Sequence, residues 1–360
     1  MSTQNMGKDY VLFLHGVSVR ELPDCPDDRN FPNYANHLFE LIREFLNRGA
    51  TPCDVEKIAL YYGDLNMYEE QSLLTLFQSS PEWERFWFRH ARETILLQIV
   101  GDIALYVNPY VAARIVERLH QAVVKLQRRE QEQQERGRLH LVSHSLGTII
   151  LFDVLFAGRW ESEDMPGYNC IQELRDALCG AGTKPEEGIQ VASIHTMGSP
   201  IPLFSLLDMH SRQLENGAGQ HKSSHEIGSK LQVFLQHLAR SRGGRRLPWW
   251  NYAHPGDPLA YPLEELLYQL VDQKRDYLEV HDVVTMPGDI GDWMIESFKQ
   301  SSTALIHAGA AHHSYWNSEI IARRIARTIQ ETSLADREGE MDHASSFYLV
   351  EDVDPRLHRL

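Results

Sequence analysis

Short unbroken runs of apolar residues recur along the chain, and each run ends in small or polar residues. The first run is Tyr10 to Leu14, and His15-Gly16 closes it. Apolar runs without polar alternation are typical of strands that are buried on both faces, as the strands of a parallel sheet are. The same pattern predicts strands over residues 10–16, 55–62, 139–142, 189–197, 247–253 and 277–281.

Amphipathic helical periods separate these predicted strands. Residues 33–48 place apolar side chains on one helical face and stop at Gly49, and a last helix is predicted over residues 318–331. Strands that alternate with helices indicate right-handed crossover units and an α/β fold. We therefore expect a mostly parallel central sheet with helices on both faces in residues 1–335, followed by a charged C-terminal tail over residues 336–360.

The strand pattern is interrupted over residues 65–135, where only helical periods occur. This segment is longer than a single crossover requires, and it carries a group of aromatic residues from Trp83 to Phe88 and then the apolar run Ile95 to Val107. One interpretation is a helical insertion or cap that supplies an apolar pocket for substrate. The other is a set of helices that cover one face of the sheet, because apolar stripes at helical spacing are most often core.

Candidate chemistry is concentrated where the apolar run Leu139 to Val142 meets a helical pattern that begins at Thr148. The connecting residues are Ser143-His144-Ser145-Leu146-Gly147. A serine in a sharp turn between a strand and a helix holds its Oγ clear of the backbone, and the helix N-terminus behind it supplies partial positive charge. Small residues are needed two positions before and after that serine, and Ser143 stands where the usual pattern has glycine. The pattern therefore predicts a nucleophile elbow with Ser145 as the nucleophile.

Backbone N–H groups for a developing oxyanion are expected from two turns. The turn after the first strand would present the N–H of Val17, and the start of the helix after Ser145 would present that of Leu146. Beside the substrate we expect Gly16, His144 and Ser199. Ser199 is a rival nucleophile on paper, but the following Pro200 makes a turn into a helix hard to build there. We therefore interpret that segment as pocket wall.

An acid and a base follow the serine in the chain order Ser, Asp, His, which is the order found in α/β-hydrolases. Asp257 lies in a Pro-Gly-Asp-Pro turn directly beyond a predicted strand, and Asp282 and Asp289 are competing acids. His312 and His313 lie in a loop of small residues, and either is a candidate base. Together these residues predict nucleophilic catalysis through an acyl-enzyme.

These motifs resemble those of α/β-hydrolases of the lipase and serine esterase type. The matching segments span Leu14 to Trp316, and the turn Asp257-Pro258-Leu259-Ala260 is similar to the equivalent turn of DDHD-type intracellular phospholipases. The resemblance implies a serine hydrolase that cleaves acyl esters of a small molecule or a lipid and requires no cofactor. It also implies His312 as the base, because the related pattern places that histidine three residues before a tyrosine, here Tyr315.

Composition indicates which partners and which cellular location the expected enzyme has. Hydrophobic residues make up 42% of the 360 residues, and the formal net charge of −15 argues against nucleic acid or an anionic membrane as a general partner. The cysteines at 25, 53, 170 and 179 are too widely spaced to indicate a disulfide framework or a zinc site. The polar N-terminus and the interrupted apolar run over residues 95–107 predict no signal peptide and no transmembrane segment, which leaves transient contact with a membrane surface compatible with the chain. We expect a cytoplasmic protein.

Alternative functions stay open from the sequence. A metallohydrolase is suggested by His307, His312 and His313, but no His-Glu-x-x-His or comparable ligand spacing is present, so no metal site is predicted. A catalytically silent hydrolase fold that acts as an interaction module would share the same sheet and turns. A thioesterase or an acyltransferase would use the same three residues as an esterase.

Overall fold

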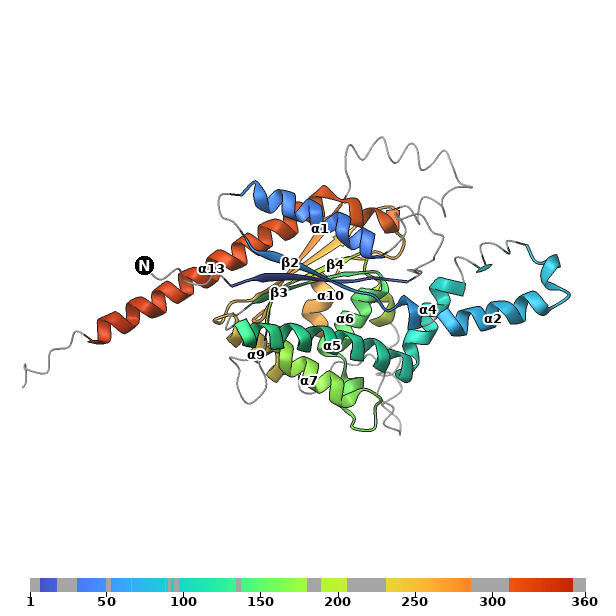
Figure 1. Ribbon diagram of the computed structural model, residues 1–360, viewed down its shortest axis with the longest axis horizontal. Helices are drawn as coiled ribbons and strands as arrows, with labels where there is room; N and C mark the ends of the chain where they lie inside the picture. Colours follow the sequence, from blue (N-terminus) through green and yellow to red (C-terminus); the bar gives the residue numbers. More distant parts are fainter. Residues whose placement is uncertain are drawn as a thin grey trace, which may run out of the picture.

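All six strands of the central sheet are parallel in the computed structural model (Figure 1). The strands are β1 (Asp9–Leu14), β2 (Val55–Leu60), β3 (Arg138–His144), β4 (Gln190–Met197), β5 (Leu247–Ala253) and β6 (Leu278–Val284). Their order across the sheet is β2-β1-β3-β4-β5-β6. The structure describes residues 7–17, 31–49, 53–65, 67–87, 89, 92–93, 97–133, 137–179, 189–205, 231–285 and 311–351.

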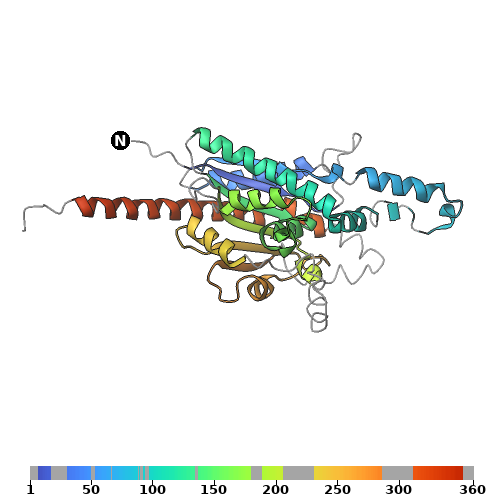
Figure 2. The same cartoon turned by 90° about the horizontal axis from the view of Figure 1, so that it is seen from below.

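Helices lie on both faces of this sheet (Figures 1 and 2). The α-helices are α1 (Phe31–Asn47), α2 (Met67–Ser79), α4 (Leu97–Val107), α5 (Pro109–Gln133), α6 (Leu146–Phe156), α7 (Tyr168–Cys179), α9 (Leu231–Ser241), α10 (Glu264–Leu270) and α13 (Glu319–Glu351). Short 3₁₀ helices are η2 (Gly63–Leu65), η3 (Trp83–Arg85), η5 (Gly158–Glu161) and η7 (Ser314–Asn317). The fold is thus α/β-hydrolase-like, which confirms the fold class expected from the alternating apolar patterns.

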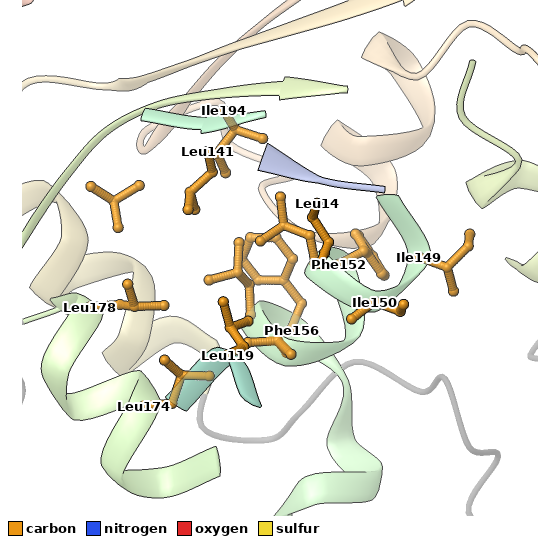
Figure 3. Packing of buried hydrophobic residues seen from close by; sticks show 14 of the residues in the cluster. Leu14, Leu119, Leu141, Ile149, Ile150, Phe152, Phe156, Leu174, Leu178 and Ile194 are labelled. Carbon is orange, nitrogen blue, oxygen red and sulfur yellow. The ribbon is translucent and has the colours of Figure 1, made fainter. Parts of the chain in front are cut away.

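The larger half of the core lies between the sheet and helices α5, α6, α7 and α9. Alternate strand residues such as Leu14, Leu141 and Ile194 point to this face and pack against Phe152 and Phe156 of α6 (Figure 3). Helix α6 is buried along its whole length, because both the sheet and the outer helices cover it. The helix begins directly after Ser145, which is its N-cap residue.

The opposite face of the sheet is covered by α1 and α13. Val11 and Phe13 of β1 point to this side and pack against α1 and the first half of α13. Helix α13 continues to Glu351, through much of the segment that the sequence pattern assigned to a tail (Figure 1). Within the described ranges, no helix is long and apolar enough to cross a bilayer.

Parallel strands bring the segments that follow them to one edge of the sheet, which we call the carboxyl edge. Ser145 follows β3, and Asp257 lies in the turn beyond β5. Residues that follow β1 and β2 reach the same edge, because Leu60 is paired with Leu14 and Leu14 with Ser143. Ligand sites of open parallel sheets lie at this edge.

The segment over residues 65–135 divides into two parts. Helices α4 and α5 pack on the body, and a 2.7 Å hydrogen bond from Tyr106 to Asp153 of α6 ties α4 to the core. In contrast, α2 and η3 extend away from the sheet (Figures 1 and 2). We call residues 67–87 the arm. Part of the segment therefore covers one face of the sheet, and the arm projects from the carboxyl edge.

Candidate active site

The backbone at Ser145 has an unusual conformation. Its φ of 53° and ψ of −125° lie in a region that residues with side chains rarely adopt, and such strain costs about 1 to 3 kcal/mol. Hydrogen bonds hold it there. The Ser145 N–H donates to the Met197 carbonyl (3.0 Å), and the Thr148 hydroxyl donates to the Ser145 carbonyl (2.7 Å). The chain therefore makes a sharp, supported turn from β3 into α6, with the serine at its apex.

Two glycines allow other backbone segments to approach this turn closely. A Cβ on Gly147 would lie 2.7 Å from the Leu14 carbonyl oxygen and nearer still to that of His15. A Cβ on Gly16 would overlap the Cβ of Ser145 and lie 3.1 Å from the Ser145 Oγ. Any larger residue at either position would push β1 away from α6. The turn after β1 therefore lies directly against the serine side chain.

A histidine and an aspartate meet beside the same turn. Nδ1 of His312 and Oδ2 of Asp257 are 2.8 Å apart, and both residues are buried. The ionised carboxylate is an acceptor only, so Nδ1 carries a proton and, in the neutral ring, Nε2 is a bare acceptor. Among the residues that the structure describes, this buried Nε2 has no hydrogen-bond partner. His312 therefore keeps a proton-accepting atom unused inside the protein.

Gly198 links this pair to the serine. Its φ is +58°, and a Cβ there would come within 2.9 Å of Asp257 Oδ2 and 3.2 Å of His312 Cε1. Its neighbour Met197 accepts the hydrogen bond from the Ser145 N–H. The glycine thus gives the histidine and the aspartate room beside the turn that carries Ser145.

The charge on Asp257 is stabilised from several sides. Burial alone raises the pKa of this carboxyl, but the hydrogen bond and charge of His312, the hydroxyl of Tyr315 and the Leu259 N–H together bring the pKa below its ordinary value. Tyr315 donates to Oδ2 (2.7 Å), the Leu259 N–H donates to Oδ1 (3.0 Å), and the Tyr315 hydroxyl oxygen accepts from the His254 N–H (2.9 Å). The carboxylate is therefore ionised and fixed in orientation at neutral pH.

His144 supports the backbone of His312. Its Nε2 donates to the His312 carbonyl oxygen (2.7 Å), and the ring is buried. Burial, followed by the neighbouring His312 and His313, lowers the pKa of His144 far below its ordinary value, so the ring is neutral. This hydrogen bond ties the residue before Ser145 to the short helical segment that carries the candidate base.

The loop after β1 is held by a stacked pair of rings. The centroids of His15 and Tyr62 are 3.9 Å apart, and the Tyr62 hydroxyl donates to the His15 carbonyl oxygen (2.8 Å). Nε2 of His15 accepts the Tyr62 N–H (3.0 Å), so Nδ1 carries the proton and donates to the Gly16 carbonyl oxygen (2.7 Å). Val17 follows in a buried turn. Leu146 is the first residue of α6, and the first N–H groups of a helix have no partner within the helix.

Comparison with known proteins finds relatives over about half of the chain. This chain is 27% identical over 180 residues to "Probable phospholipase YOR022C, mitochondrial" of Saccharomyces cerevisiae. The match covers 49% of this chain and 20% of the yeast protein. It is 25% identical over 203 residues to "Phospholipase DDHD1" of Mus musculus, which covers 46% of this chain and 34% of the mouse protein. Both relatives carry phospholipase names. No family model matches the chain.

The remaining predicted residues occupy distinct places. Ser199 is buried, with its hydroxyl 2.8 Å from that of Thr148, which in turn bonds the Ser145 carbonyl oxygen. His313 is exposed and stacks on Tyr34, and the hydrogen bond to Asp257 comes from His312 instead. Asp282 lies within β6 and accepts the N–H groups of Leu263 and Glu264 near the start of α10. Of the two histidines and three aspartates that the sequence offered, the structure pairs His312 with Asp257.

Some sequence candidates fall outside the described residues. Asp289, His307 and Cys25 are among them. Within the described ranges, no group of three or more His, Cys, Asp or Glu side chains is arranged to hold a metal ion.

Sequence reasoning did not assign roles to Tyr315, Thr148 and Tyr62. Tyr315 served only as a marker of spacing, although its hydroxyl contacts Asp257 directly. In the sequence Thr148 marks only the start of a helical pattern, whereas in the structure its hydroxyl donates to the carbonyl oxygen of Ser145. Tyr62 ends the second predicted strand, and no local pattern indicates that it would stack on His15 from the neighbouring strand. Of these three residues, only Tyr315 belongs to a sequence pattern, the His-x-x-Tyr spacing, that could indicate a place in the site.

Proposed function

We propose that this chain is a serine hydrolase that cleaves carboxylic esters of lipids, with Ser145 as nucleophile, His312 as base and Asp257 as acid. The observation that carries the proposal is the buried, unpartnered Nε2 of His312, whose other ring nitrogen is bound to Asp257 beside the strained turn at Ser145. A buried nitrogen without a partner is costly, and such groups are kept where chemistry uses them. The phospholipase names of the two relatives support a lipid as the substrate.

The proton path follows from these atoms. Nε2 of His312 accepts the proton of the Ser145 hydroxyl as the oxygen attacks the acyl carbonyl, and Nδ1–H continues to donate to Asp257. The imidazolium that forms is stabilised by a carboxylate whose pKa is already lowered. It then gives the proton to the leaving alcohol. Water attacks the acyl-enzyme by the same route and releases the fatty acid.

Negative charge on the carbonyl oxygen needs donors that are fixed before the reaction begins. The N–H of Leu146, at the start of α6, and that of Val17, in the turn held by the His15–Tyr62 stack, are the donors we assign. A single oxyanion donor is typically worth about 3 kcal/mol in the transition state. The close approach of Gly16 to Ser145 supports this assignment, because it brings the turn with Val17 to the reacting centre.

Hydrolysis of phosphatidylcholine by the full chain tests the bond that is cleaved. We expect a free fatty acid and a lysophospholipid as products, and we expect Ser145→Ala to abolish their release. Release of a phosphate-bearing headgroup would place the cut at a phosphoester bond and overturn the proposal. Retention of full activity in Ser145→Ala would do the same.

Three other functions would use the same fold. A thioesterase would form the same acyl-enzyme and would prefer a thioester over an oxygen ester as the acyl donor. An acyltransferase would also form it and would prefer an alcohol over water as the acyl acceptor. A catalytically silent interaction module would form no acyl-enzyme at all. Matched oxygen esters and thioesters, offered with and without a glycerol acceptor, separate these outcomes by the acyl product.

A further inference from the structure

The helix of the arm buries almost none of its side chains. From Tyr68 to Ser79, every side chain of α2 is exposed except those of Glu70 and Leu74. The exposed residues include large apolar ones: Tyr68, Leu73, Leu76 and Phe77. A helix of 13 residues is only marginally stable in water when nothing packs against it. The arm therefore offers an apolar surface that no described part of this chain covers.

The outer end of the arm is a row of aromatic rings. Trp83 stacks between Phe77 and Phe86, with centroids 5.6 Å and 5.7 Å away, and the Arg92 guanidinium lies 5.3 Å from the Phe86 ring. Trp87, the next residue, is 81% exposed. Stacking holds these rings in fixed positions, so they present a firm aromatic end and do not collapse onto the body.

The composition of this end matches a lipid surface. Residues 83–92 hold three arginines and one glutamate, in a chain whose net charge is −15. Aromatic rings favour the boundary between headgroups and acyl chains, and arginine side chains extend from that depth to phosphates. The arm also projects away from the sheet, so its end can reach a surface before the body does (Figures 1 and 2). We propose that the arm docks this protein on the surface of a phospholipid bilayer.

The position of the arm determines which edge of the sheet faces the bilayer on docking. The arm follows β2 and η2 at the carboxyl edge, and the end of β2 is level with Ser143 through the register of β1. Ser145 lies at the same edge. A bilayer that receives the aromatic end therefore faces the edge that carries the candidate active site. Docking extends the proposed function by naming the lipid-facing element, but it does not depend on turnover.

Vesicle binding by the full-length Ser145→Ala variant tests the proposal without any catalysis. Phosphatidylcholine vesicles that contain phosphatidylserine should sediment this protein. Adding Phe86→Ser and Trp87→Ser should weaken partitioning by roughly a hundredfold or more, because two large apolar side chains then no longer enter the acyl region. Arg85→Gln and Arg92→Gln should weaken binding to the anionic vesicles and have little effect on pure phosphatidylcholine.

The matched control is Leu334→Ser, an exposed apolar residue of α13 that follows Ser333, whose hydroxyl contacts Arg138 at the opposite edge of the sheet. It should bind vesicles like the parent, and all variants should share its melting temperature. Equal vesicle binding with and without Phe86 and Trp87 overturns the proposal. So does a concentration-dependent change in molecular mass that these substitutions abolish in the absence of lipid, since that result identifies a second copy of the chain as the partner.

Discussion

The sheet carries two buried histidine–aspartate pairs, one near each edge. At the carboxyl edge, His312 contacts Asp257 at 2.8 Å and leaves Nε2 without a partner among the described residues. At the opposite edge, His140 contacts Asp9 at 3.2 Å, and its other ring nitrogen is 2.7 Å from the Ser193 hydroxyl. The first pair has an unused atom and the second has none.

The second pair belongs to a buried series of hydrogen bonds that runs from Arg138 to Tyr252. Arg138 donates to both oxygens of Asp9, at 2.7 Å and 2.9 Å. Beyond Ser193, the chain continues through His195 to the Tyr252 hydroxyl. Every polar end is satisfied inside the protein, so this network stabilises the fold and offers nothing to a substrate. A contact between histidine and aspartate is therefore a weak sign of catalysis, and a buried unpartnered ring nitrogen is a stronger one.

The largest expected effect is on turnover and separates two adjacent histidines. His312→Ala should lower kcat for a short soluble ester by at least about 10³-fold, because loss of a triad member removes the base. His313→Ala should change kcat less than about tenfold, because its ring stacks on Tyr34 and His312 holds the hydrogen bond to Asp257. Steady-state kinetics of the two variants measure the difference. Equal losses of kcat in the two variants would show that the hydrogen bond to Asp257 does not identify the base.

The next prediction is that substitution of Asp9 lowers stability and substitution of Asp257 lowers activity. Asp9→Ala leaves Arg138 buried without its carboxylate, which should cost about 3 to 5 kcal/mol of unfolding free energy. The protein that remains folded should keep its kcat. Asp257→Asn should do the reverse, with a large fall in kcat and a smaller fall in stability. Urea unfolding and steady-state kinetics on both variants test this. If both variants lost stability and kcat to the same extent, the two pairs would not differ in role.

Buried neutral histidines should make stability depend on pH. Burial lowers the pKa of His144 and His195 far below the ordinary value of 6.5. The unfolded chain therefore takes up these protons first as the pH falls below about 6.5, and the folded state loses stability until its own lower pKa is reached. Each histidine contributes a slope of up to about 1.4 kcal/mol per pH unit. His195→Gln should reduce the slope of unfolding free energy between pH 7 and 5, and an unchanged slope would contradict this.

The smallest effect concerns two buried tyrosine hydroxyls. Tyr315→Phe removes a hydrogen bond to the charged Asp257 and should lower kcat roughly tenfold, since such bonds are worth about 1.5 to 3 kcal/mol at most. Without that donor the pKa of Asp257 should rise, so activity should fall off at a higher pH on the acid side. Tyr252→Phe removes the hydroxyl that serves His195 and should leave the kinetics unchanged. Full pH–rate profiles of the two variants make the comparison, and parallel losses would contradict it.

The strands and the serine turn were readable from sequence because local patterns encode them. Buried parallel strands require unbroken apolar runs, and β1, β3 and β4 follow such runs closely. The turn at Ser145 requires small residues at fixed spacing, and the sequence supplies them. The order of the six strands has no such local signal, since it depends on which segments pair across the sheet.

The parts that sequence could not settle all depend on contacts between distant residues. Asp257 and Asp282 both stand near strand ends in the sequence, but only the fold shows that one meets His312 and the other binds the start of α10. Apolar periods in residues 65–135 likewise do not tell which helix packs on the body. Helix α5 covers the sheet and α2 stands in the arm, although both show helical patterns.

Covalent labelling of Ser145 tests the central claim most directly. A fluorophosphonate probe reacts with a serine that a neighbouring base activates, so we expect one adduct per chain, mapped by mass spectrometry to Ser145. The adduct should be lost in Ser145→Ala, should form far more slowly in His312→Ala, and should form at the normal rate in His313→Ala. An adduct on Ser199, or labelling of Ser145 that is indifferent to His312, would contradict the account.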